Sequence, residues 1–437
     1  MNTVEKIKNA GVVGAGGAGF PTHVKVNCKA EYVIANGAEC EPLLRVDQLV
    51  MAKYAKEIVE AMAVLVEHTG ATYGVIGLKK HYHDAISEIE KYTGGKISIQ
   101  LFDSYYPAGD EQTMVYEVTG RVVPTGGLPL DVGAVVVNVS TLLNISNALN
   151  DIPVTDKHVT ITGEVENPIT VRSPIGYPIR KLIELAGGPV DEKSFTLIIG
   201  GPLMGRVSNN WDEAVTKTTG GVIVLKNEHS LLDKKKDDFD RDVKLAKAVC
   251  CQCNFCTDLC PRNALGLHVE PHKAMRAVAN NDGRLLGQVN GVFSCCNCGL
   301  CTLYACNFGL NPSAVINRIK IGLGEEGVKP IKEIHTRVDR SINTKKVPVS
   351  RLIARLGLKK YDVETPLVED GIGAKNVKIP LQMHIGAPSE AVVSVGDRVK
   401  KGDIIGAIPK DKLGAVVHSS IDGSVKDVTS DYVEIAL

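Results

Sequence analysis

The stretch CCQCNFCTDLCPR, residues 250–262, decides the fold of its part of the chain. Its spacing, C-x-x-C-x-x-C-x-x-x-C-P, is typical of a segment that wraps a [4Fe–4S] cube. Three closely spaced thiolates bind three irons, and the fourth cysteine, set off by Pro261, reaches over to another cluster. Thiolates suit this task because the iron of such clusters prefers soft sulfur donors.

A second run, CCNCGLCTLYAC at residues 295–306, repeats the arrangement with one extra residue before the last sulfur and no proline after it. In a two-cluster site each run lends its last cysteine to the other cube. A four-cysteine zinc site is the alternative, but zinc usually takes two CxxC pairs rather than two evenly stepped triplets. The sequence therefore predicts an electron-transfer protein with two clusters. One cube is expected on Cys250, Cys253, Cys256 and Cys306, and the other on Cys295, Cys298, Cys301 and Cys260.

Composition agrees with an intracellular redox protein. The chain has 437 residues and 12 cysteines, and a chain of that length needs no disulfide staples. Fifty basic residues balance fifty acidic ones, which gives no electrostatic reason to expect nucleic acid. The first residues lack a signal peptide, and no uncharged apolar run approaches the ~20 residues of a membrane span. We expect a cytoplasmic protein without a membrane span.

The amino-terminal third alternates strands and helices. Short β-branched runs at 32–35, 74–78 and 134–137 are of the kind buried in a parallel sheet. Residues 47–67 and 83–92 carry apolar side chains at helical spacing. This order predicts an α/β layer fold with ligands at the carboxyl ends of the strands.

The first loop, GAGGAGFP at residues 14–21, is rich in glycine, and Lys25 follows shortly after. Glycines let backbone N–H groups approach a phosphate, and a lysine supplies the counter-charge. Taken alone the loop is a weak signal, because its spacing matches neither the dinucleotide fingerprint nor a P-loop. A glycine-rich turn that binds no ligand is the alternative interpretation of this loop.

Several motifs in fixed order resemble a known family. The segments GGAGFPT at 16–22, NGAECEP at 36–42, YPAGDEQ at 106–112, GGLP at 126–129 and NVST at 138–141 are similar to the flavin site of the NADH-oxidising subunit of respiratory complex I. They are closer still to the C subunit of the Rnf complex. With the two cysteine runs, the resemblance covers nearly the whole chain. Ala15 and Ala38 depart from the complex I pattern, which has arginine and aspartate there, and this weakens the nicotinamide contacts more than the flavin assignment.

The resemblance implies a non-covalently bound FMN in the first domain. Its phosphate end would be held by Gly14, Gly16, Gly17, Gly19 and Lys25. Asn36, Glu39 and Glu41 would lie near the flavin ring, where NADH also stacks. Gly109, Asp110 and Glu111 would form an acidic lip, and Asn138 with Thr141 would close the pocket. Glu39, Glu41 and Glu111 are the expected catalytic carboxylates.

The remaining segments resemble two small modules. Residues 156–209 are similar to the β-grasp (SLBB-like) module that follows the flavin domain in these families, and the chain from about Met383 resembles a barrel-sandwich domain of the biotinyl/lipoyl kind. Lys412 stands where lipoyl domains carry their modified lysine, but hairpin lysines are common and we expect an unmodified barrel. The fold class is thus multidomain α/β: a Rossmann-like FMN domain at 1–155, the β-grasp module at 156–232, a helical two-cluster ferredoxin-like domain at 233–330 and the barrel at 375–437.

The expected function is electron transfer from NADH through FMN and two [4Fe–4S] clusters to a partner protein. A carboxyl-terminal barrel favours the types that serve as cobalamin reductases, or as the electron input of proline reductase or methylenetetrahydrofolate reductase assemblies, over the membrane Rnf subunit, whose barrel comes first. The resemblance implies a setting in the cytoplasm, either within a bacterial microcompartment or bound to a larger enzyme complex, and a protein that is part of a multi-subunit complex. The alternative class is a non-catalytic iron–sulfur adaptor that relays electrons from another flavoprotein.

Overall fold

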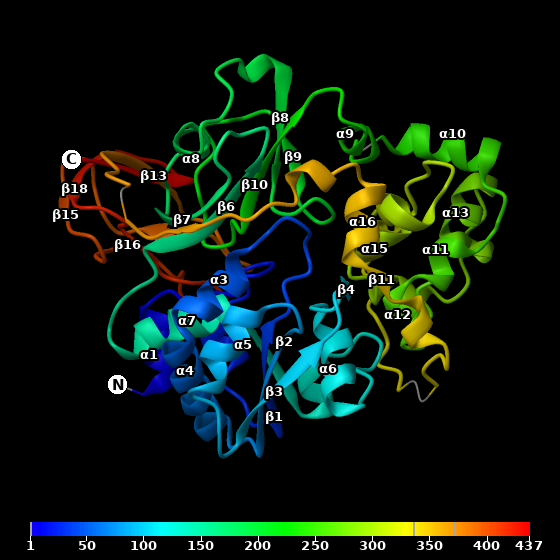
Figure 1. Ribbon diagram of the computed structural model, residues 1–437, viewed down its shortest axis with the longest axis horizontal. Coiled ribbons are helices and arrows are strands. Elements are labelled where there is room, and N and C mark those ends of the chain that lie inside the picture. Colours follow the sequence, from blue (N-terminus) through cyan, green and yellow to red (C-terminus); the bar gives the residue numbers. More distant parts are fainter. Residues whose placement is uncertain (1, 237, 335–336, 371) are drawn as a thin grey trace.

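The structure is a computed structural model that describes residues 2–236, 238–334, 337–370 and 372–437. Figure 1 shows the amino-terminal α/β unit in blue and cyan, with the green second sheet above it. The helices of the cysteine-rich segment lie to one side, and the red carboxyl-terminal sheets lie on the opposite side. In the described part of the chain, no helix combines the length and the apolar character that a bilayer crossing requires.

The amino-terminal unit is built on a parallel sheet of four strands in the order β3-β2-β1-β5. The strands are β1 (Tyr32–Gly37), β2 (Tyr73–Lys79), β3 (Ile97–Phe102) and β5 (Ala134–Asn138). The three β-branched runs predicted as strands are therefore strands, and they are the adjacent β2, β1 and β5. Their carboxyl ends meet at one edge of the sheet, where open α/β sheets bind ligands.

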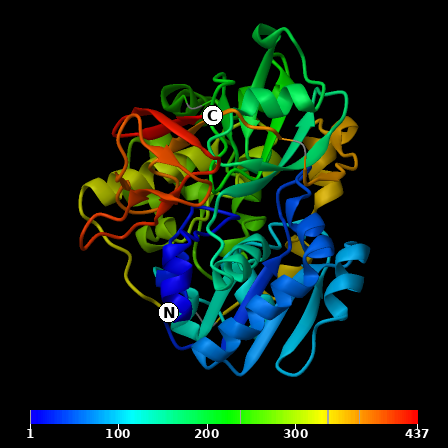
Figure 2. The same ribbon diagram turned by 90° about the vertical axis from the view of Figure 1, so that its left-hand side faces the viewer.

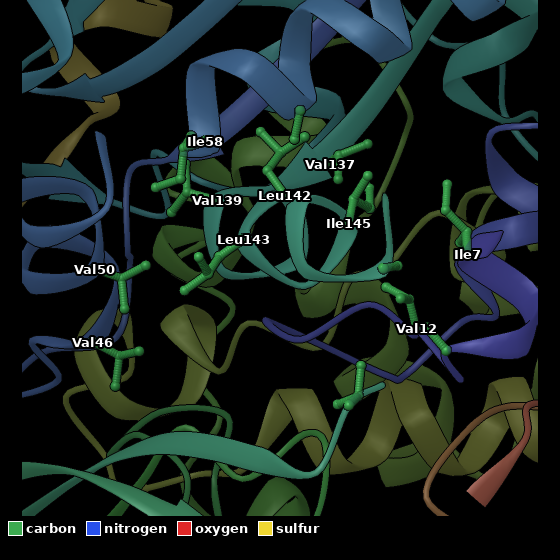
Figure 3. Packing of buried hydrophobic residues seen from close by; sticks show 14 of the residues in the cluster. Ile7, Val12, Val46, Val50, Ile58, Val137, Val139, Leu142, Leu143 and Ile145 are labelled. Atoms are coloured by element: carbon green, nitrogen blue, oxygen red, sulfur yellow. The ribbon is translucent and has the colours of Figure 1, made fainter. Parts of the chain in front are cut away.

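Helices cover this sheet on both faces. They are α1 (Thr3–Asn9), α2 (Thr22–Lys25), α3 (Val46–Lys53), α4 (Ala55–Thr69), α5 (His83–Glu90), α6 (Glu111–Thr119) and α7 (Val139–Leu149). Figure 3 shows α7 at the centre of the largest core, where Val139, Leu142 and Ile145 pack among side chains of α1, α3 and α4. This packing fixes α3 and α7 beside each other at the strand ends.

The helical stretch predicted at 47–67 is divided into α3 and α4. Tyr54, with φ −121° and ψ 36°, ends the first helix and begins the second. No glycine or proline marks the break, so the sequence does not signal it. At this break the Tyr54 side chain lies near Glu369, which is far along the chain.

The second sheet has six strands in the order β12-β7-β6-β10-β8-β9. They are β6 (Asp156–Gly163), β7 (Ile169–Pro174), β8 (Phe195–Ile199), β9 (Arg206–Ser208), β10 (Gly221–Lys226) and β12 (Leu367–Val368). Helix α8 (Ile179–Leu185) packs on it through Ile179, Leu182 and Ile183. The distant β12 completes the edge, so a later part of the chain returns to this module.

The cysteine-rich segment is helical. Its helices are α9 (Ser230–Lys234), α10 (Phe239–Val249), α11 (Phe255–Asp258), α12 (Pro261–Ala264), α13 (Pro271–Asn280), α14 (Val289–Phe293) and α15 (Pro312–Glu325). A small core around Leu267, Met275 and Val315 joins α10, α13, α14 and α15, whereas Leu231 and Leu232 of α9 pack in another core. Four cysteines, Cys250, Cys260, Cys295 and Cys306, pack against this core.

The chain then passes back across the molecule before its final module. Strand β11 (Val347–Pro348) pairs with β4 (Tyr105–Tyr106) of the first unit, and helix α16 (Val349–Arg355) follows. The carboxyl-terminal module has two antiparallel sheets. The first is formed by β13 (Asn376–Pro380), β15 (Arg398–Val399), β18 (Gly423–Val428) and β19 (Tyr432–Ala436). The second is formed by β14 (Glu390–Ala391), β16 (Ile404–Ala407) and β17 (Val417–His418). Lys412 lies in an exposed loop of this module. Figure 2 shows the red module beside the blue amino-terminal helix.

Candidate functional site

The glycine-rich loop is held as a closed turn at the strand ends. The Gly14 N–H donates to the Phe20 carbonyl at 3.0 Å, and the Ala15 N–H donates to Oγ1 of Thr141 at 2.9 Å. Gly19 has φ +74°, a conformation that favours glycine, and its carbonyl accepts from the Ile385 N–H of the carboxyl-terminal module. The loop is therefore fixed by contacts from two modules.

Gly17 faces open space at the tip of this loop. A Cβ added there would meet no heavy atom within 4 Å, whereas one added at Gly16 would lie 2.7 Å from Nδ2 of Asn138. Gly17 lines a cleft of about 550 Å³ to which the second sheet and the carboxyl-terminal module also contribute, through Thr216, Thr218 and Gln382 among others. A group such as a phosphate can thus approach the backbone at Gly17.

The asparagines expected near the flavin cross-link the strand ends. Nδ2 of Asn36 donates to the Gly109 carbonyl at 2.9 Å. Asn138 caps α7 by accepting from the backbone of Ser140 and Thr141. Nδ2 of Asn138 donates to Asp47 at 2.8 Å. Asn36, Gly109, Asn138 and Thr141 are thereby brought together with the glycine-rich loop, as the resemblance implies.

Glu39 lies beside Asp47, which the sequence reasoning did not identify. Oε2 of Glu39 accepts from the Asp47 N–H at 3.2 Å, and Asp47 is buried. Burial and, second, the Asp47 carboxylate raise the pKa of Glu39 to about 8. Burial also raises the pKa of Asp47, and it lowers the pKa of the nearby Lys157 to about 8. Perturbed groups of this kind cluster at functional sites.

Glu41 is turned toward the second module. Its two carboxylate oxygens accept from the Leu203 and Met204 N–H groups, each at 2.8 Å. Nζ of Lys235 holds the same loop by donating to the Leu203 and Gly205 carbonyls. Glu41 thus joins the first unit to the Gly200–Gly205 loop, and its catalytic role remains a prediction.

Of the expected acidic lip, Asp110 and Glu111 are both paired with cations. Asp110 accepts from Nε and Nη2 of Arg262 at 2.8 and 2.7 Å, and both side chains are buried. The same carboxylate caps α6 through Thr113. Glu111 is paired with Nζ of Lys25 at 2.6 Å, so Lys25 already has a counter-charge. A cofactor contact of these groups remains a prediction.

The cysteines fall into two neighbouring groups. Cys250, Cys253, Cys256 and Cys306 line one cavity together with Cys251 and Met275. The thiol of Cys256 interacts with those of Cys306, Cys253 and Cys250, and burial is the main cause that raises its pKa to about 12. Cys298 and Cys301 both interact with Cys260, and Cys301 also interacts with Cys295 and, more weakly, with Cys256 of the first group. The exchange of last cysteines between two clusters stays a prediction.

The two cysteine runs share an unusual backbone. Gln252 and Asn254 flank Cys253 with φ of 57° and 66°, and Asn297 and Gly299 flank Cys298 with φ of 54° and 73°. Left-handed residues on both sides of a central cysteine curve each loop around a common centre, and such strain concentrates at functional sites. The extra residue of the second run is taken up by a π-helical turn, Cys301–Ala305.

These residues fit both kinds of cofactor. Crowding buried thiols together disfavours their ionised forms unless a cationic group binds them, which iron clusters supply. In the described residues, no three His, Cys, Asp or Glu side chains converge on a single-ion site. At the first unit, the open backbone at Gly17 offers donors to a phosphate, and the buried Oε1 of Gln112 has no hydrogen-bond partner. The asparagines and the glycine-rich loop would hold FMN, and the two cysteine groups would hold clusters.

Four residues of the site were not predicted as site residues from the sequence: Asp47, Tyr106, Lys157 and Arg262. Arg262 directly follows the Cys-Pro pair, and Tyr106 belongs to a motif used for recognition, so both had a local signal. Asp47 and Lys157 stand in ordinary helix and strand patterns, and only the fold brings them together.

Four family models match successive parts of the chain. The Nuo51 FMN-binding domain matches residues 7–147, and the SLBB domain matches residues 158–207. The 4Fe-4S dicluster domain matches residues 249–311, and the RnfC barrel sandwich hybrid domain matches residues 356–436. The predicted fold class, with its flavin, β-grasp, iron–sulfur and barrel-sandwich parts, is confirmed.

Known proteins match the chain over different lengths. The chain is 39% identical over 433 residues to the cobalamin reductase PduS of Salmonella typhimurium, a match that covers 99% of this chain and 95% of that protein. It is 33% identical over 273 residues to the C component of the Na⁺-translocating ferredoxin:NAD⁺ oxidoreductase complex of Acetobacterium woodii, covering 61% of this chain and 58% of that component. A crystal structure of an NAD⁺-reducing [NiFe]-hydrogenase in the air-oxidized state covers 82% of this chain and 66% of its own, with 19% identity and a TM-score of 0.46, which is too distant to support an inference.

We predict that Arg262→Ala destabilises the protein by about 3 kcal/mol, because it leaves the Asp110 carboxylate buried without its partner. A lower melting temperature with faster loss of iron on warming is the expected result. Arg284→Ala, which breaks the exposed pair with Asp282, is the matched control and should melt with the wild type. Equal melting of Arg262→Ala and the wild type would contradict this role of the pair.

A second prediction concerns pH. Since the pKa of Glu39 rises from 4.5 to about 8 on folding, the native state binds more protons than the unfolded state between these values. The free energy of unfolding therefore contains a contribution that is full below pH 4.5 and is lost as the pH rises through 8. The melting temperature of Glu39→Gln should fall less than that of the wild type over this range. Glu60→Gln, at an exposed carboxylate of α4, is the control, and its melting temperature should change with pH as that of the wild type does. If the melting temperature of Glu39→Gln also changes with pH as that of the wild type does, Glu39 does not have the raised pKa.

Gly17→Val should abolish FMN binding without unfolding the chain. The new side chain has room in the flavin-free protein but occupies the space above the loop backbone. Flavin content after reconstitution is the measurement, and iron content should stay normal. Gly94→Val, at another exposed glycine with open space, is the matched control. Normal flavin content in Gly17→Val would mean that the phosphate lies elsewhere.

Proposed function

Because this chain belongs to the family of the cobalamin reductase PduS, we propose that it oxidises NADH at an FMN in residues 1–155 and delivers electrons through two [4Fe–4S] clusters to a partner protein. The matches to an FMN-binding domain and a dicluster domain make it a flavin- and iron–sulfur-dependent oxidoreductase. FMN accepts two electrons from a hydride donor and releases them singly, whereas each cluster carries one. The residues between the flavin domain and the cysteine runs must therefore connect the FMN to the clusters.

The observation that carries the proposal is the contact between Tyr106 and Cys298. Tyr106 is buried, and its hydroxyl donates to the Cys298 carbonyl at 2.7 Å. Burial first, and then Glu41 and the thiols of Cys298 and Cys40, raise the pKa of Tyr106 above its usual range. These neighbours come from the flavin-side loops and from the second cysteine run, so Tyr106 lies between the two. The Asp110–Arg262 pair closes the same junction. We therefore assign the cluster of Cys260, Cys295, Cys298 and Cys301 as the first acceptor.

The other cluster is the proposed exit. Its ligand Cys253 is exposed, as are the neighbouring apolar side chains Phe255 and Phe308 at 50% and 51% exposure. Exposed aromatic side chains around a redox centre are typical of a docking surface. A partner can reach this cluster without contact with the flavin domain.

The acceptor is proposed from the relatives. A corrinoid held by a partner protein is the first to test, because the full-length relatives are cobalamin reductases. Proline reductase and methylenetetrahydrofolate reductase assemblies are the other candidates, in the cytoplasm or in a microcompartment. An adaptor without NADH chemistry is the competing function. Flavin content together with NADH-dependent dye reduction by the isolated protein separates the two.

We predict that anaerobically purified protein contains close to eight irons with matching sulfide. Cys256→Ala and Cys298→Ala should each lose one cluster and keep flavin. NADH should still bleach the flavin of Cys298→Ala, because that variant lacks only the first acceptor, but electrons should no longer reach the exit cluster. In Cys256→Ala the remaining cluster should still be reduced by NADH.

Iron and sulfide analysis with absorbance after rapid mixing measures these outcomes. Cys251→Ala is the matched control, because it removes a thiol of the same cavity that is not a proposed ligand. Stoichiometric zinc without sulfide would end the cluster assignment. Normal reduction of the exit cluster in Cys298→Ala would reverse the proposed order.

A further inference from the structure

A second cavity leads to the flavin-side carboxylates. Its volume is about 250 Å³, and it is lined by side chains of α4, α7 and β6, among them Glu57, Asn144, Asp156, Ser140 and Lys157. The cavity is large enough for water, and charged and polar side chains lie among its apolar lining residues. None of these residues belongs to the cleft at Gly17.

Hydrogen bonds continue from the inner end of this cavity. Oγ of Ser140, which lines the cavity, donates to Oδ1 of Asp47 at 2.9 Å. The other oxygen of Asp47 accepts from Asn138, and the Asp47 N–H donates to Glu39. Nζ of Lys157 donates to the Ala15 carbonyl of the glycine-rich loop at 2.8 Å. The chain of contacts therefore runs from the cavity to the residues directly beneath the loop.

The reaction requires such a connection. A hydride from NADH carries one proton and two electrons, and iron–sulfur clusters take up only the electrons. One proton must therefore leave the flavin site for every NADH oxidised, according to NADH → NAD⁺ + H⁺ + 2 e⁻. At the junction with the cysteine loops, Tyr106 is buried and its hydroxyl already donates to the Cys298 carbonyl, so this side is closed to water. The cavity at Ser140 instead has the exposed Ile152 in its lining and thus reaches the surface.

We propose that Glu39 and Asp47 take up this proton and that Ser140 passes it to water in the cavity, an inference that rests on the proposed NADH oxidation. Lys157, also at the inner end, stabilises the Asp47 carboxylate once the proton has left. Glu39 and Asp47 are proton acceptors, Ser140 is the relay to the cavity, and Lys157 is a positioning residue.

The charges around the pair suit a proton that is held and released near neutral pH. Arg45, Lys79 and Lys157 face the two carboxylates, and Tyr82 and Cys40 are the other ionisable neighbours. Burial lowers the pKa of Lys79, and the neighbouring Cys40 and Glu39 act in the opposite direction. A group transfers protons most effectively when its pKa is near the working pH. The pKa of Glu39, raised to about 8, meets this condition.

Ser140→Ala and Asp47→Asn test the relay in the complete protein with FMN and clusters bound. Each form is reduced with dithionite, the excess is removed, and the protein is mixed with ferricyanide in weakly buffered solution containing a pH-indicator dye. In the wild type, proton release should follow flavin reoxidation. In both variants, proton release should slow at least about tenfold and flavin reoxidation should become more sensitive to D₂O.

Ser146→Ala is the matched control, because it removes a buried serine hydroxyl from the same helix away from Asp47, and it should behave as the wild type. A carboxyl band in the reduced-minus-oxidised infrared spectrum should be lost in Asp47→Asn or Glu39→Gln. If Asp47→Asn fails to bind flavin, Ser140→Ala alone decides the outcome.

Proton release at the wild-type rate in Ser140→Ala would overturn the proposal. Because dithionite supplies the electrons, this result is independent of NADH. Failure of NADH to bleach the wild-type flavin would remove the proposed donor while leaving the proton path in place.

Discussion

The buried ion pair between Asp110 and Arg262 is the constraint on which the rest of the site depends. Each charge would be costly to bury alone, so the flavin-side loop and the first cysteine run can come together only in the arrangement that pairs them. The pair lies next to the junction of Tyr106 with Cys298 and at the start of α6, where Asp110 also acts as the cap. One contact therefore holds three parts of the site together. They are helix α6 with Glu111 and Gln112, Tyr106 between the flavin-side loops and the second cysteine run, and the segment that follows Cys260. Electron transfer between separate modules requires that the modules are held in fixed positions relative to one another.

The modules are joined at several other points by single buried groups. Nζ of Lys217 donates to the Gly11 carbonyl of the first unit and to the Val416 carbonyl of the carboxyl-terminal module, and burial lowers its pKa to about 7. Glu41 binds the Gly200–Gly205 loop, and Gly19 binds Ile385. The barrel-like module therefore contacts the glycine-rich loop that is proposed to bind phosphate. Its Lys412 loop is exposed, and we expect the module to support the flavin site rather than to carry a swinging group.

The sequence predicted what depends on local spacing and missed what depends on long-range contact. The strands around 32–37, 73–79 and 134–138 followed from β-branched runs, and α5 followed from its apolar spacing. The match to a dicluster domain followed from the cysteine spacing, although the π-helical turn that accommodates the extra residue did not. The division of residues 47–67 at Tyr54 has no glycine or proline to signal it. Asp47 and Lys157 were not identified either, because their importance comes from burial beside Glu39 and the Ala15 carbonyl. Asp110 and Glu41 show the converse, since a motif marks them as site residues but cannot reveal the arginine and backbone groups to which they are bound.

The central claim is that NADH electrons enter through the flavin domain and reach the clusters only from there. Rapid mixing of NADH with the full-length protein, in flavin-loaded and flavin-stripped forms with intact clusters, tests it most directly. In the loaded form, flavin absorbance should fall first and cluster absorbance should follow. In the stripped form, dithionite should reduce both clusters while NADH reduces neither, and added FMN should restore the reaction. Reduction of the clusters by NADH in flavin-free protein would contradict the account.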